Sequence, residues 1–162
     1  MSHRWLHPLA LWLDKPNLWD INRRSVAGGV AVGLFCGLIP GPVQMFGGAL
    51  LSILFRVNLP VALFTTLYTN PFTIVPLYLI AYEYGALVTG QHLGLTAEQL
   101  ALPEMHWNNW HTVVSAWLAT LGKPFLVGLP LLAATLAVIG YVAVRLLWRW
   151  RVMHAWQKRL RK

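Results

Sequence analysis

The hydrophobic pattern of the chain contains two apolar stretches, each interrupted by proline near its middle. The first covers residues 25–55 with a break at 40–42, and the second covers 59–88 with a break at 70–72. A plain membrane helix needs roughly 20 uninterrupted apolar residues to cross ~30 Å of hydrocarbon, and no arm of either stretch is that long. Matched broken helices are typical of re-entrant or discontinuous membrane segments, which usually line a site.

The first stretch is predicted to form a helical hairpin that dips into the membrane and returns. Its break, Pro-Gly-Pro at 40–42, interrupts the helix because proline has no backbone N–H and glycine lets the chain turn. Arg23 and Arg24 precede the stretch and Arg56 follows it. The positive-inside rule therefore favours the cytoplasm for both ends.

A stripe of glycines runs along the first arm of this hairpin. Gly29, Gly33 and Gly37 recur every four residues and so share one helix face. Such a stripe favours close packing against another helix. The alternative is a groove that leaves room for a ligand.

The second stretch has more polar residues around its break. It is expected to begin after Asn58, where Pro60 suits the first helical turn, and to end near Gly90. Pro71 donates no hydrogen bond, so a backbone carbonyl near it is left free. Side chains able to pair such freed groups lie on both sides of the break: Thr65, Thr66, Thr69, Asn70 and Thr73.

These elements predict an all-α integral membrane protein with two proline-broken (re-entrant or discontinuous) units and one C-terminal transmembrane helix. We expect a single membrane domain, 1–162. It begins with an interfacial segment (1–22) and a broken-helix core (23–90), followed by an amphipathic Trp-rich segment (91–122) opened by a capping box at 96–99. A transmembrane helix (123–148) and a basic cytoplasmic tail (149–162) complete it. For the last helix to end in the cytoplasm, either 59–90 crosses once or 107–123 pairs with 124–148; we favour the first.

Composition supports the membrane assignment. The chain is 57% apolar and 11% charged, against about 25% charged residues in soluble domains. Its nine Trp residues suit a membrane interface. The net charge of +8 is concentrated at segment ends, which favours a topological role over nucleic-acid binding. The one cysteine, Cys36, is interpreted as a packing residue.

Residues 24–90 resemble a bacterial membrane family catalogued as domain of unknown function 2062. The resemblance rests on the segment 25–35, the Ile-Pro turn at 39–40, Gln44, the segment 56–62 and Asn-Pro-Phe-Thr at 70–73 leading to Pro-Leu-Tyr at 76–78. It implies a small bacterial inner-membrane protein and assigns no reaction. In outline, the pattern also looks like the re-entrant architecture of DedA-type lipid transporters.

The chemistry-bearing residues give no catalytic or metal motif, so we expect no enzyme, no metal and no cofactor. The expected substrate-binding residues lie at the breaks and segment ends: Gln44, Arg56, Asn58, Asn70, Thr73 and Glu83. Each has a structural alternative. Glu83 is either a proton-coupling group or an interfacial acid that reaches water. Arg56 either binds a lipid phosphate or only anchors topology, and the amide and threonine groups either line a pocket or pair freed backbone groups.

The sequence supports two candidate functions. The first is a carrier or flippase for a lipid or a small anionic solute, working through the paired broken helices. The second is a non-catalytic scaffold or accessory subunit, in which glycine-rich faces hold a partner. The expected partners are membrane lipids, with anionic head groups at the basic tail, and a second copy or another protein.

Overall fold

The computed structural model describes residues 17–41, 43–70, 72–91, 94, 96–101, 103–104 and 109–160, with the backbone alone at 97, 110 and 155–160. All the elements it contains are helices: α2 (Arg23–Cys36), α3 (Val43–Phe55), α4 (Leu59–Thr66), α5 (Ile74–Thr89), α6 (Ala97–Leu100) and α7 (Trp110–Leu160). Pro42, Pro71 and the predicted interfacial helix up to residue 16 lie outside the described residues. The predicted all-α class is confirmed for the described part.

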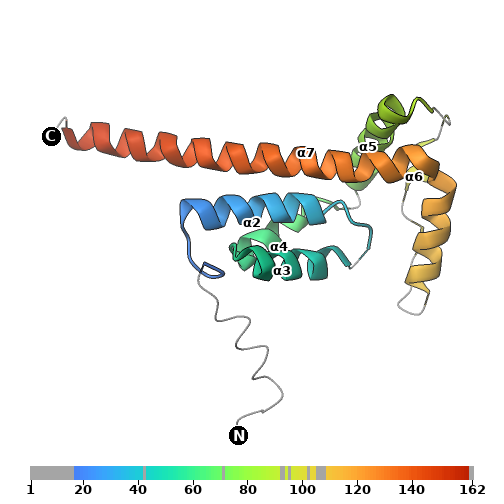
Figure 1. Ribbon diagram of the computed structural model, residues 1–162, viewed down its shortest axis with the longest axis horizontal. Helices are drawn as coiled ribbons and strands as arrows, with labels where there is room; N and C mark the ends of the chain where they lie inside the picture. The colour runs from blue at the N-terminus through green and yellow to red at the C-terminus, as the bar shows by residue number, and fades with distance from the viewer. Residues whose placement is uncertain are drawn as a thin grey trace, which may run out of the picture.

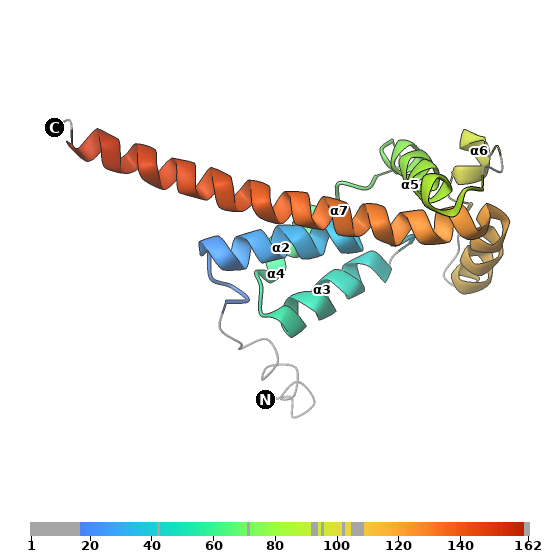
Figure 2. The same cartoon turned by 45° about the horizontal axis from the view of Figure 1, so that its top comes forward.

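The first broken stretch forms a helical hairpin. Asn22 begins α2 because its side-chain oxygen accepts a hydrogen bond from the Ser25 N–H at 2.8 Å. Figures 1 and 2 show α3 returning beside α2, with α4 packed against both helices. The halves of the second stretch, α4 and α5, are separated at 67–73, close to the break expected at 70–72.

The glycine stripe of α2 is packed against α4 and the segment that follows it. A methyl group at Gly29 would lie 2.7 Å from the Asn58 carbonyl oxygen, and one at Gly33 would lie 2.5 Å from the Ala62 carbonyl oxygen. Both distances are too short for a real side chain. These two glycines therefore have the packing role predicted for the stripe, because only glycine lets the two backbones come this close.

α7 is a long helix with a sharp bend. It bends at Gly122, whose φ of 70° and ψ of −172° are not helical, and Figure 1 shows the first part of α7 turned away from the rest. Glycine adopts a positive φ at little cost. The bend falls where the sequence separates an amphipathic segment from a transmembrane helix. The helix then continues to Leu160, past the predicted end of the span at 148.

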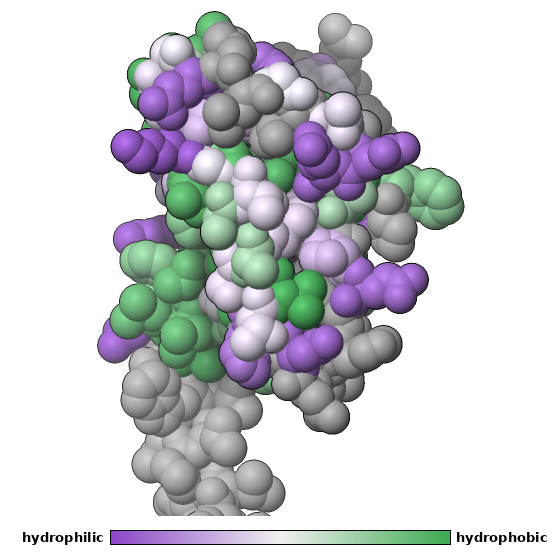
Figure 3. Space-filling model, turned by 90° about the vertical axis from the view of Figure 1, so that its right-hand side faces the viewer, coloured by the Kyte–Doolittle hydropathy of each residue, from purple (hydrophilic) through white to green (hydrophobic). Residues whose placement is uncertain are grey.

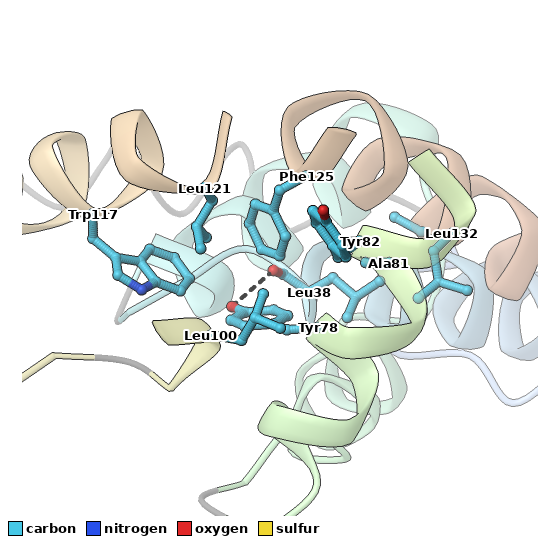
Figure 4. Close-up of a cluster of buried hydrophobic side chains, with 10 residues drawn as sticks. Leu38, Tyr78, Ala81, Tyr82, Leu100, Trp117, Leu121, Phe125 and Leu132 are labelled. Atoms are coloured by element: carbon cyan, nitrogen blue, oxygen red, sulfur yellow. Dashed lines mark hydrogen bonds between the residues drawn. The ribbon is translucent and has the colours of Figure 1, made fainter. Parts of the chain in front are cut away.

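A second close crossing holds α5 on α7. Methyl groups at Gly85 and Gly128 would collide with the backbone of the opposite helix, so these two glycines form the contact. Beside it, Tyr78, Trp117 and Phe125 form an aromatic cluster, with ring centroids 5.2–5.6 Å apart. Figure 4 shows Leu38, which lies next to the break of the first hairpin, packed against this cluster. Trp117 also donates a hydrogen bond to the Gln99 carbonyl of α6 at 3.0 Å.

Large apolar side chains face outward. In α3 only Gly48 and Ser52 are buried, whereas Phe46, Leu50 and Leu54 are 72%, 60% and 64% exposed. Large apolar side chains are also exposed on α4, α5 and α7: Phe64, Ile80, Leu87, Val138, Ile139 and Val142. Figure 3 views the molecule from the end formed by α6 and the start of α7, where hydrophilic side chains lie around a middle of pale and apolar ones.

Among the described residues, one helical segment is long and apolar enough to cross a membrane, His111–His154 of α7. Two shorter apolar helices accompany it, Val43–Phe55 and Ile74–Thr89. The predicted C-terminal apolar helix is therefore present as a candidate span.

The close approach of α2 to α4 predicts a position-specific effect of adding one methyl group. Gly33→Ala is expected to lower the free energy of unfolding by about 1–3 kcal/mol, because the methyl group collides with the Ala62 backbone. Gly47→Ala is the matched control, since its methyl group would lie 3.5 Å or more from its neighbours. Thermal unfolding in detergent measures both. Equal stability of the two variants would contradict the packing.

Candidate functional site

The breaks of the two stretches meet inside the molecule. The last carbonyl groups of a helix have no partner within it, and at the C-terminal end of α2 and just beyond it three hydroxyl groups from the second stretch supply partners. Tyr68 donates to the Leu34 carbonyl at 2.9 Å, Thr69 to the Gly37 carbonyl at 2.7 Å, and Tyr78 to the Leu38 carbonyl at 3.3 Å. These three bonds join the first break to the second.

Gln44 lies at the same junction, at the start of α3. Its side-chain oxygen is 3.0 Å from the Thr69 hydroxyl, which therefore contacts both the end of α2 and the start of α3. The Gln44 side chain is half-buried and Thr69 is buried. The two residues bring both arms of the first hairpin to the second break.

Asn70 and Thr73 organise the backbone that leads into α5. The Asn70 side-chain oxygen accepts hydrogen bonds from the N–H groups of Phe72 at 2.9 Å and Thr73 at 3.1 Å. The Thr73 hydroxyl donates to the Tyr68 carbonyl at 2.6 Å and accepts from the Asn70 N–H at 3.0 Å. Asn70 is exposed, and its amide nitrogen takes part in none of these bonds.

Asn58 joins three parts of the chain at the opposite end of α2. Its side-chain oxygen accepts from the Val61 N–H at 2.9 Å and caps α4, and its amide nitrogen donates to the Asp20 carbonyl at 3.1 Å. Its own N–H donates to the Ser25 carbonyl at 3.2 Å. Asn58 is 2% exposed, so all of these groups serve the fold.

Arg56 occupies a strained backbone position. Its φ is 53°, in the left-handed region that glycine normally fills after a helix, and the Val57 N–H donates back to the Ser52 carbonyl at 3.0 Å. The Arg56 side chain is exposed. An arginine here costs stability that a glycine would not.

Glu83 lies on a different surface, between α5 and α7. It is one of the residues that line an open groove of about 440 Å³, whose mainly apolar walls include Leu79, Leu87 and Leu132. Near it, the hydroxyl groups of Tyr84 and Thr135 are 3.5 Å apart. The structure thus divides the predicted site residues into three places: Gln44, Asn70 and Thr73 at the breaks, Arg56 and Asn58 at the start of α4, and Glu83 apart from both.

A second groove, which the sequence does not predict, lies between α2, α3 and α7. It also has a volume of about 440 Å³ and apolar walls, lined by Gly28, Ala31, Val32, Phe35, Leu51, Phe55, Val57 and Ala137. Two of these residues, Phe55 and Val57, flank Arg56. The small residues Gly28 and Ala31 are the available sequence signal, but only tertiary structure places α7 opposite them.

No group of three His, Cys, Asp or Glu side chains suited to a metal ion occurs in the described part of the chain. His3, His7, His92 and His106 lie outside it.

Family comparison covers nearly the whole chain. The bacterial family described as Uncharacterized protein conserved in bacteria (DUF2062) matches residues 6–157. The chain belongs to this family. The match extends the resemblance seen at 24–90 in both directions, so α6 and α7 of this DUF2062 protein are part of the family pattern. No curated protein and no solved structure matches the chain.

The junction of the two breaks predicts that the Thr69 hydroxyl contributes more to the free energy of unfolding than the hydroxyl of a comparable threonine within a helix. Thr69→Val is expected to lower the free energy of unfolding by about 1–3 kcal/mol, because the buried Gly37 carbonyl loses its hydroxyl partner. Thr65→Val is the control, since Thr65 donates only to the Val61 carbonyl one turn earlier. Thermal unfolding in detergent compares them, and an equal or larger loss in Thr65→Val would contradict this role.

Proposed function

We propose that this DUF2062 protein is embedded in the bacterial inner membrane as a multi-pass protein, with α7 crossing and the α2–α3 hairpin entering from one side. The distribution of side chains on α2 and α3 supports the proposal, because mainly small residues are buried there while large apolar ones such as Phe46, Leu50 and Leu54 are exposed. In water such a surface would promote association, whereas hydrocarbon accommodates it. At 1.5 Å per residue, α2 and α3 are only about 20 Å long, too short to cross ~30 Å.

The distribution of charge supports an orientation. Figures 1 and 2 show α7 running antiparallel to α2, so the C-terminal part of α7 leaves the bundle at the end where α2 begins. This basic end carries Arg23, Arg24, Arg56, Arg145, Arg149 and Arg151. Between Lys123 and Arg145 α7 has no charged residue, over about 30 Å. The positive-inside rule places the basic end in the cytoplasm.

We propose that the protein carries or flips an amphiphilic, anionic lipid between the leaflets, without a chemical step. The observation that supports this function is the meeting of the two breaks inside a lipid-facing bundle. Backbone that is irregular at membrane depth is tolerated where protein encloses it or where it lines a path. The apolar grooves beside Arg56 and Glu83 offer surfaces for acyl chains.

A scaffold function is the second candidate, and a specific observation favours it. The oxygen atoms of Gln44, Asn70 and Thr73 already accept or donate hydrogen bonds within the fold. Residues that serve only to pair backbone groups need not touch a substrate. The amide nitrogen of the exposed Asn70 separates the two functions, because a carrier would use it and a scaffold would not.

A transport assay tests this difference. Liposomes containing the protein and a fluorescent phosphatidylglycerol are expected to exchange the lipid between leaflets faster than protein-free liposomes. Asn70→Asp keeps both caps on the backbone, yet it replaces a donor with a negative charge and is expected to slow exchange of the anionic lipid about tenfold, a loss of about 1.4 kcal/mol. Leu50→Ala, on the outer face of α3, is the control. Exchange no faster than in protein-free liposomes would favour the scaffold.

Topology is tested by labelling single cysteines in a Cys36→Ala background. Arg23→Cys and Arg149→Cys are expected to react with an impermeant maleimide from the cytoplasmic side only, because both belong to the basic end. Glu98→Cys, beyond the other end of the bundle, is expected to react from the opposite side. Labelling of the two arginine positions from different sides would contradict the orientation.

A further inference from the structure

We propose that the groove between α2, α3 and α7 binds one acyl chain of an anionic phospholipid whose phosphate contacts Arg56 and Arg24. The inference deepens the proposed function, since it rests on membrane embedding and names the lipid class and its binding site. It does not depend on transport, because a scaffold could hold the same lipid.

The shape of the groove suits a chain rather than a compact polar solute. Its α2 wall extends from Gly28 to Phe35, a length of about 10 Å along the helix. Its volume of about 440 Å³ lies within the range of small-molecule sites. The lining is apolar throughout, so it can bury methylene groups but offers no partner to a polar ligand.

The charge at one end of the groove suits a phosphate. Arg56 lies between two lining residues, Phe55 and Val57, and Arg24 lies one helical turn before the lining residue Gly28. The two segments touch, because the Asn58 N–H donates to the Ser25 carbonyl and the Val57 side chain packs against Gly28. Two exposed arginines are thus close in the chain to residues that line one end of an apolar groove.

The other charged groups at this corner leave it positive. Arg23 begins α2, and Asp20 lies close by, since its carbonyl oxygen accepts a hydrogen bond from Asn58. Three guanidinium groups and one carboxylate therefore lie in this region, which leaves it with a net positive charge. Arginine suits a phosphate because it can bind the group in a bidentate manner. In the proposed orientation these arginines lie at the cytoplasmic surface, and the groove descends from them into the hydrocarbon, as a lipid does.

The backbone at Arg56 gives an independent indication. A left-handed position that ends a helix is filled at lowest cost by glycine, yet here it carries a long cationic side chain. Strained residues of this kind tend to occur at functional sites. Because of this strain, removing the arginine should have two opposite effects: it should raise the stability of the fold and lower the affinity for lipid.

The experiment uses the full chain, delipidated in a neutral detergent and titrated with dioleoyl phosphatidylglycerol or dioleoyl phosphatidylcholine, with bound lipid counted by native mass spectrometry. The wild type is expected to bind one phosphatidylglycerol at least about tenfold more tightly than phosphatidylcholine. Arg56→Gly is expected to lower the phosphatidylglycerol affinity about tenfold, which is the loss of one charge-assisted contact, while raising the Tm by about 2–4 °C. Lys123→Gln, at an exposed position beside the bend of α7 and outside the groove, is the charge control.

Filling the groove tests the acyl chain separately. Ala31→Trp and the smaller Ala31→Leu are expected to lower the affinity for both lipids, whereas Ala134→Trp, on the exposed face of α7, should lower neither. Unchanged phosphatidylglycerol affinity in Arg56→Gly, or in a folded Ala31 variant, overturns the proposal. A loss of binding in these variants without any lipid exchange in liposomes supports the site and rejects only the carrier function.

Discussion

The structure depends on one constraint, the pairing of backbone carbonyls where an apolar helix stops short. α2 ends before Pro40, and its last carbonyls would otherwise face apolar surroundings without partners. Hydroxyl groups of Tyr68, Thr69 and Tyr78 pair the carbonyl of Leu34 in α2, that of its C-cap Gly37 and that of Leu38 just beyond. These hydroxyls can reach the end of α2 only because glycines let α2 and α4 approach at backbone distance. Close packing and polar pairing are therefore two parts of one arrangement.

The same constraint bears on function. Most polar groups at the breaks are used in hydrogen bonds within the fold, so the amide nitrogen of Asn70 is the one contact with a substrate that we propose there. The lipid site proposed here lies elsewhere, in the groove that ends at Arg56. In that arrangement the broken helices provide shape, and the arginines of the basic end provide charge.

Much of the fold could be predicted from local signals. The helices of both broken stretches, the glycine stripe and the bend near residue 122 follow from proline and glycine positions, because these residues act on the backbone next to them. The half-formed capping box also follows, since the Gln99 side-chain oxygen accepts from the Thr96 N–H at 3.0 Å. The length of α7 could not be predicted in this way, because no proline or glycine marks its C-terminal end.

The sequence by itself determined where helices break, which faces are smooth and where positive charge gathers, since each depends on residue type and spacing. Only the tertiary structure decided which groups meet. It placed the Thr69 hydroxyl on the Gly37 carbonyl, 32 positions away, and set Ala137 of α7 opposite Ala31 to form a groove. It also separated Glu83 from the breaks. Such contacts depend on the relative orientation of packed helices, which no local pattern specifies.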